Sequence, residues 1–128
     1  MNKEKSVLDS SAILAVLNLE KGAEKVAPLL SNSIVSSINV AEVLTKLVER
    51  NISLENALED LLRLGLEIVE FDVKQAAKVA QLRPLTKHLG LSLGDRSCLA
   101  LAILQNAVAV TADKTWTKLN FCTIEVIR

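Results

Sequence analysis

Four acidic residues stand at positions that would bring them together in a folded α/β protein. Asp9 ends a short apolar run near the start of the chain, and Asp113 ends another near its close. Glu42 falls in the first turn of one predicted helix, and Asp95 opens another. The carboxyl ends of parallel strands, and the helices that follow them, share one edge of a sheet. We therefore expect these four carboxylates to line one acidic pocket.

Crowded carboxylates limit what such a pocket can bind. They repel one another, and some would take up protons unless a cation balanced their charge. An all-oxygen ligand set without histidine or cysteine favours Mg²⁺ or Mn²⁺ over zinc. These ions orient phosphate oxygens and activate a water for attack at phosphorus. The pocket therefore suggests phosphoryl chemistry, with the phosphodiester of a nucleic acid as one candidate substrate.

Short apolar runs alternate with helical periodicity along the whole chain. The predicted strands cover residues 6–9, 33–38, 66–72, 108–113 and 122–127. The predicted helices cover 10–20, 22–30, 40–50, 53–65, 73–83 and a segment from Gly94 or Asp95 to 107, with at most two turns at 114–119. Asn39 is the expected cap of the third helix, and Pro84 is expected to break or bend the chain. This alternation predicts one α/β domain over 1–128 with a mostly parallel sheet of about five strands, covered on both faces.

Composition excludes several classes of protein. The 128 residues carry 15 basic and 15 acidic side chains, so bulk electrostatic coating of nucleic acid is not expected. A single histidine, His88, rules out a ribonuclease mechanism that uses a histidine pair, and no glycine-rich phosphate loop follows a strand. Two cysteines give no disulfide framework, and no apolar run is long enough to cross a bilayer. We expect a cytoplasmic protein with no membrane partner.

Four segments together resemble a known family. They are "VLDSSAIL", "SSINVAEVL", "LSLGDRSCLALA" and "AVTADKTWTKL", which carry the four acidic residues in the family's order. The chain resembles the PIN-domain ribonucleases, and most closely the VapC-like toxins of toxin–antitoxin pairs. This resemblance implies an αβα sandwich, a metal-dependent endoribonuclease that cuts RNA, a homodimer and a cognate antitoxin.

The resemblance also assigns residues. It matches Asp9, Glu42, Asp95 and Asp113 to the family's acidic metal-binding and catalytic positions. It matches Ser10 and Thr111 to accessory polar positions beside the metal. From the sequence itself, Arg96 and Lys114 each neighbour a proposed ligand and are the best basic candidates for binding substrate, although both could be plain solvated charges.

Other residues have both a functional and a structural interpretation. Lys46 lies one turn beyond Glu42 and could bind an RNA phosphate or pair with a carboxylate. Trp116 could stack on a base, but packing in the core is the favoured interpretation. Cys98 is expected in the core. The surplus leucines of 53–65 could line a dimer or antitoxin groove or could be buried within the domain.

Two other functions remain open at this stage. A phosphate-accepting receiver domain also uses strand-end aspartates and Mg²⁺, although only Asp72 ends the middle strand. A PIN-like domain with an idle site could act only through a partner protein. The sequence does not specify which RNA would be cut, because loops usually set that choice.

Overall fold

The computed structural model describes residues 4–128. Its strands are β1 (Ser6–Leu8), β2 (Ser33–Ser36), β3 (Glu67–Val69), β4 (Val108–Thr111) and β5 (Ile124–Val126). Its α-helices are α1 (Ser10–Leu17), α2 (Ala23–Val26), α3 (Ser37–Glu49), α4 (Leu54–Arg63), α5 (Val73–Thr86) and α6 (Leu93–Gln105). Three 3₁₀ helices join them: η1 (Ala27–Asn32), η2 (Lys87–Leu89) and η3 (Lys114–Lys118). Within this part of the chain no helix is both long enough and apolar enough to cross a membrane.

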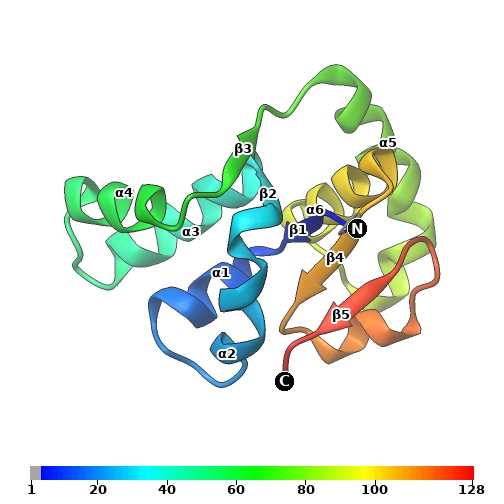
Figure 1. The fold of residues 1–128 in the computed structure, drawn as a ribbon. Helices are drawn as coiled ribbons and strands as arrows, with labels where there is room; N and C mark the ends of the chain where they lie inside the picture. Colours follow the sequence, from blue (N-terminus) through cyan, green and yellow to red (C-terminus); the bar gives the residue numbers. More distant parts are fainter. Residues whose placement is uncertain (1–3) are drawn as a thin grey trace.

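The five strands form one parallel sheet in the order β3-β2-β1-β4-β5 (Figure 1). The register pairs Val7 of β1 with Ile34 of β2 and with Ala109 of β4. This order differs from the 2-1-3-4-5 order of receiver domains. The α/β class and the parallel sheet are confirmed, and the receiver alternative is wrong.

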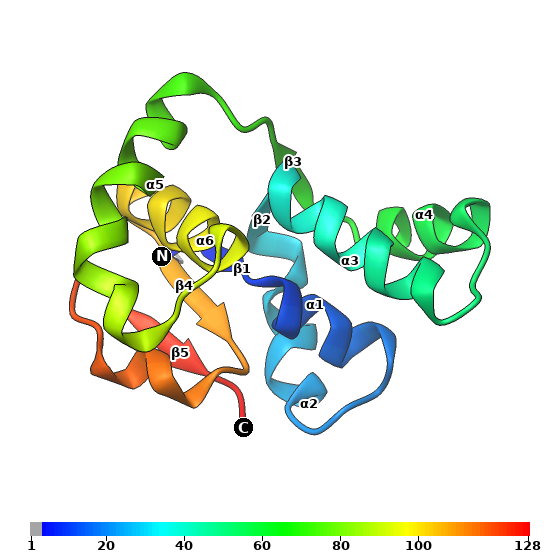
Figure 2. The same cartoon turned by 180° about the vertical axis from the view of Figure 1, so that it is seen from behind.

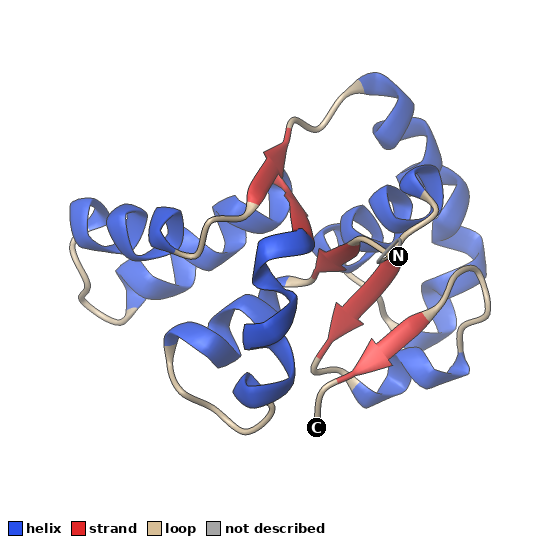
Figure 3. Ribbon diagram, in the orientation of Figure 1, coloured by secondary structure: helices blue, strands red, loops and turns tan. Residues whose placement is uncertain are grey.

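Helices cover both faces of the sheet, as Figures 2 and 3 show. Side chains alternate between the faces along each central strand, because successive strand residues point in opposite directions. In β1, Val7 packs with the cluster that includes residues of α5 and α6, whereas Leu8 packs with the cluster under α1, α3 and α4. Both residues are fully buried. The apolar runs that form β1, β2 and β4 are therefore strands buried on both faces of the sheet.

Several predicted boundaries are wrong, each for a local reason. The strand predicted over 66–72 is only three residues long, because it lies at the sheet edge and its residues are largely exposed. The helix predicted over 22–30 divides into α2 and η1, with Pro28 early in η1, where a missing N–H costs least. Helix α5 continues past Pro84 to Thr86 before the chain tightens into η2.

The start of α3 differs in a way that matters for the pocket. Ser36 caps this helix by accepting a hydrogen bond from the Ile38 amide at 3.2 Å. The prediction that Asn39 caps it is wrong, and Glu42 lies in the second turn instead of the first. Asn39 is instead fully buried within the helix.

The structure shows that Trp116 and Cys98 both lie in the core. Trp116 of η3 is fully buried in the core cluster next to α6, so it offers no exposed ring for stacking on a base. Cys98 is also fully buried, and its thiol lies 3.7 Å from the Val7 carbonyl oxygen. The core interpretation is confirmed for both.

Candidate metal centre

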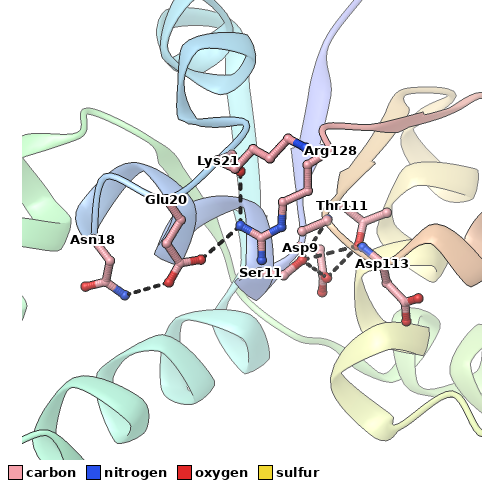
Figure 4. Close-up of polar contacts among 9 residues, drawn as sticks. Asp9, Ser11, Asn18, Glu20, Lys21, Thr111, Asp113 and Arg128 are labelled. Atoms are coloured by element: carbon pink, nitrogen blue, oxygen red, sulfur yellow. Dashed lines mark hydrogen bonds and ion pairs between the residues drawn. The ribbon is translucent and has the colours of Figure 1, made fainter.

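Asp9 lies directly after β1, between the sheet and the first turn of α1. Although it occupies the cap position, its side chain caps no amide of the helix. Its Oδ2 atom accepts hydrogen bonds from the Ser11 hydroxyl at 2.7 Å and the Thr111 hydroxyl at 2.9 Å (Figure 4). Thr111 ends β4, the strand paired with β1. The carboxylate is thus fixed across the centre of the sheet, and a simple capping role is excluded.

Burial makes the charge of Asp9 unfavourable. Only 4 % of the residue is exposed. The pKa of this carboxyl group is raised from 3.8 to about 6. Loss of hydration is the largest cause, the nearby charges of Asp95 and Glu42 act in the same direction, and the two hydroxyl donors oppose the shift. A buried carboxylate that is disfavoured in this way is a common feature of functional sites.

Glu42 is held by two donors from different elements. Its Oε1 atom accepts hydrogen bonds from the Ser10 hydroxyl and from the Asn39 amide, the latter at 2.9 Å. The same Asn39 amide nitrogen lies 3.1 Å from Ser10 Oγ and 3.0 Å from the Gly94 carbonyl oxygen. Asn39 therefore connects α1, α3 and α6 at one buried point beside the pocket.

Gly94 gives Glu42 the space that it occupies. A Cβ atom at Gly94 would overlap all three atoms of the Glu42 carboxylate group. Gly94 lies in the first turn of α6, next to Asp95. Glycine is thus required here by the close approach of a carboxylate.

Asp95 is oriented by a capping box at the start of α6. Its Oδ2 atom accepts from the Ser92 amide at 2.9 Å, and its own amide donates to Ser92 Oγ at 3.2 Å. Partial burial raises the pKa of Asp95, and the charges of Glu42 and Asp113 add to this effect. The capping role and a place in the acidic cluster therefore coexist in one side chain.

Asp113 is the outermost of the four carboxylates. Its Oδ1 atom accepts from the amide and hydroxyl of Thr115, at 2.9 and 2.8 Å, and so caps η3. In Figure 4 its carboxylate is turned away from that of Asp9. It does not line the pocket that the other three share.

That pocket has a volume of about 480 Å³ and lies at the carboxyl edge of the sheet. Asp9, Glu42 and Asp95 line it, together with Ser10. In each of these three carboxylates, and in that of Asp113, one oxygen accepts hydrogen bonds from protein donors. The other oxygen of each carboxylate receives no hydrogen bond within residues 4–128. Carboxylate oxygens with free lone pairs are the donors that Mg²⁺ and Mn²⁺ prefer.

The carboxylates do not form a closed ligand cage. Across residues 4–128, no group of three or more acidic, histidine or cysteine side chains could hold a metal ion as the side chains stand. Mg²⁺ retains several waters and is usually bound through one or two carboxylates, so it does not need such a cage. The donor set fits a hydrated, hard divalent ion and not a structural metal.

Arg96 and Lys114, the two basic residues that the sequence suggested for substrate binding, lie outside the pocket. The Arg96 guanidinium donates from Nη1 to the Val79 carbonyl oxygen at 3.2 Å, and its Nε is buried without a partner in the described chain. Lys114 is exposed, and neither residue lines the pocket. The basic residues that do line it are Lys46, Arg50 and Arg128.

Sequence reasoning also missed polar residues that hold the carboxylates in place. One is Ser11, which donates to Asp9 and also accepts from the Ala112 amide at 2.9 Å. Asn39 lies three residues before Glu42, and this spacing puts both side chains on one helix face. That spacing is a signal from which its contact with Glu42 could have been predicted.

Comparisons with known proteins agree with this architecture. The family model described as PIN domain matches residues 6–121. A toxin–antitoxin complex from Klebsiella pneumoniae is 18 % identical, with a TM-score of 0.75 and coverage of 97 % of this chain and 98 % of that one. DNA-bound VapBC from Salmonella typhimurium is 22 % identical, with a TM-score of 0.74 and coverage of 98 % of this chain and 100 % of that one.

VapBC2 from Rickettsia felis, bound to a DNA fragment from its promoter, is 24 % identical, with a TM-score of 0.71 and coverage of 96 % of this chain and 98 % of that one. At these identities the structural matches establish the fold. No curated protein matches the chain. The family match over most of the chain, together with this fold, shows that the protein is a member of the PIN domain family.

Proposed function

We propose that this protein is an endoribonuclease that depends on Mg²⁺ or Mn²⁺ and is the toxin of a toxin–antitoxin pair. One observation carries the proposal: Asp9, Glu42 and Asp95 line one pocket, and each keeps an oxygen free of protein donors. A bound divalent ion would supply an activated water and would stabilise the leaving oxygen of the phosphodiester.

The protein's own residues have separable tasks in this proposal. Ser11 and Thr111 hold Asp9, the buried carboxylate, in one orientation. Ser10 and Asn39 hold Glu42. Each of these donors fixes one oxygen and leaves the other for a ligand, so the site is organised before an ion arrives.

The direct test is cleavage of total RNA by the purified chain with Mg²⁺, Mn²⁺ or EDTA, followed by mapping of the new ends. We expect discrete cleavage that requires a divalent ion. A protein that folds but cleaves no RNA with either ion would reject the proposal. In that case the alternative, an idle PIN domain acting through a partner, would be favoured.

We also propose a cognate antitoxin and a homodimer. The solved relatives include toxin–antitoxin complexes. On α4, Ala57 and Leu61 are buried, whereas Leu54, Leu58 and Leu62 are 59, 41 and 58 % exposed and lie along one helix face. Such a stripe is suited to a protein partner. Co-purification with the product of an adjacent reading frame, and light scattering of the isolated chain, test the two assemblies separately.

Replacement of Gly94 by alanine tests how tightly Glu42 is constrained. Alanine suits a helix better than glycine, so the stability should change by less than about 1 kcal/mol. The new Cβ should displace the Glu42 carboxylate, which is the mobile end of its side chain. We expect Mn²⁺ affinity, measured by calorimetry, to fall about tenfold or more.

A double-mutant cycle is the control for this substitution. Gly94→Ala should add little to Glu42→Ala, because the overlapping group is already absent. If Gly94→Ala lowers Mn²⁺ affinity equally in the wild type and in the Glu42→Ala variant, its effect does not come from displacing the Glu42 carboxylate.

A further inference from the structure

One face of α3 carries an acidic residue followed by two basic ones. Glu42, Lys46 and Arg50 recur every four residues, which places them along the same side of the helix. All three line the pocket that contains Asp9 and Asp95. With a rise of about 1.5 Å per residue, this row extends about 12 Å from the acidic centre towards the end of α3.

The two cations on this row have no carboxylate partner. A lysine four residues after a glutamate usually pairs with it on a helix. Here the donors to Glu42 are Ser10 and Asn39, and neither Lys46 nor Arg50 forms an ion pair with any residue between 4 and 128. Both side chains are exposed at the pocket and are free to bind an external anion.

The third cation of the pocket is already engaged. Arg128 donates to Glu20 Oε1 at 3.1 Å and to the Lys21 carbonyl oxygen at 3.0 Å, as Figure 4 shows. This pair joins the chain after β5 to the segment after α1. Arg128 is therefore occupied by the segment after α1, while Lys46 and Arg50 remain available.

The charge of the pocket depends on a bound ion. The side chains that line it include four acidic ones, which are Asp9, Glu20, Glu42 and Asp95, and three basic ones. Their net charge is −1, which a divalent ion changes to +1. Without the ion the pocket repels a polyanion, and with it the α3 row continues the positive charge outward.

We propose that Lys46 and Arg50 bind consecutive phosphates of single-stranded RNA beside the bond that is cut. This inference rests on the proposed function, and it names the residues that position the substrate. Binding along the backbone through two cations would be insensitive to base identity. Sequence preference would then have to arise elsewhere on the protein.

The test is binding of a fluorescent single-stranded RNA by anisotropy, with Ca²⁺ in place of Mg²⁺, at several salt concentrations. The variant is Lys46→Gln with Arg50→Gln, which removes both charges and keeps good helix formers. We expect about tenfold weaker binding. We also expect the slope of log affinity against log salt to be shallower by about 1.4, because each phosphate contact on a single strand contributes about 0.7.

The matched control is Lys74→Gln with Lys87→Gln. These exposed residues on α5 and η2 lie outside the pocket, and the variant has the same net charge. The control should bind RNA like the wild type. Equal losses in both variants, or an unchanged slope in the α3 variant, would overturn the inference while leaving RNA cleavage by the wild type intact. Failure of the wild type to bind and cleave RNA would reject the proposed function itself.

Discussion

Replacing Asp9 with asparagine should reduce metal-dependent RNA cleavage by about 10³-fold. Asparagine has the same shape, and its side-chain oxygen can still accept from Ser11 and Thr111, so the fold around it should persist. What it lacks is the negative charge that a divalent ion needs. Loss of a few kcal/mol of transition-state stabilisation corresponds to this rate effect, since each 1.36 kcal/mol changes a rate tenfold. Initial rates on a labelled RNA, at saturating Mn²⁺, measure it.

Asp60→Asn is the matched control for this experiment. Asp60 is an exposed carboxylate on α4 that does not line the pocket. The same chemical change there should leave the cleavage rate within a factor of two or so, as expected for a surface substitution away from the site. An Asp9→Asn enzyme that cleaves as fast as the Asp60→Asn enzyme would remove Asp9 from the reaction, and would point to a contaminating nuclease or another site.

The positions of the carboxylates could be predicted because topology determines them. Asp9 follows β1, and parallel strands present their carboxyl ends at one edge, so a residue at that point must lie near the end of β4. Burial of Asp9 also follows, since β1 is the middle strand of five. The shared edge follows from the alternation of strands and helices along the chain, which hydrophobic periodicity reveals. The pairing of β1 with β4 and the central place of β1 are known only from the structure.

The directions of the side chains could not be predicted in the same way. Asp113 follows β4 as expected, yet its carboxylate caps η3 because Thr115 supplies two donors close by. Arg96 neighbours Asp95 in sequence, but residues adjacent on a helix point about 100° apart, and Arg96 faces α5. Proximity in sequence was therefore a poor guide to which cations reach the pocket.

The network around Asn39 shows a similar limit. An asparagine just after a strand is a common helix cap, so local preference favoured that role. Ser36 begins the helix three residues earlier, and the packing of α1, α3 and α6 buries the amide among Ser10, Glu42 and Gly94. A role that depends on three elements meeting cannot be recognised from one segment.

Stability without metal should fall as the pH rises from about 4 to about 6. The pKa of Asp9 is raised from 3.8 to about 6, so in this window the folded protein keeps a proton that the unfolded chain releases. The folded state then binds more protons, and its stability decreases with pH. The shift corresponds to about 3 kcal/mol lost by pH 7. Partial burial of Asp95 acts in the same direction. Urea unfolding in EDTA across this range measures the change.

Asp9→Asn should lack most of this decrease, so at pH 7 in EDTA the variant should be more stable than the wild type. Divalent ions should then reverse the order, because an ion that binds only the folded wild type at 100 times its Kd adds about 2.7 kcal/mol. The same residue thus destabilises the empty site and stabilises the loaded one. A variant less stable than the wild type at pH 7 in EDTA would show that the ionised Asp9 side chain does not destabilise the folded protein. It would also remove the electrostatic reason for a metal at this position.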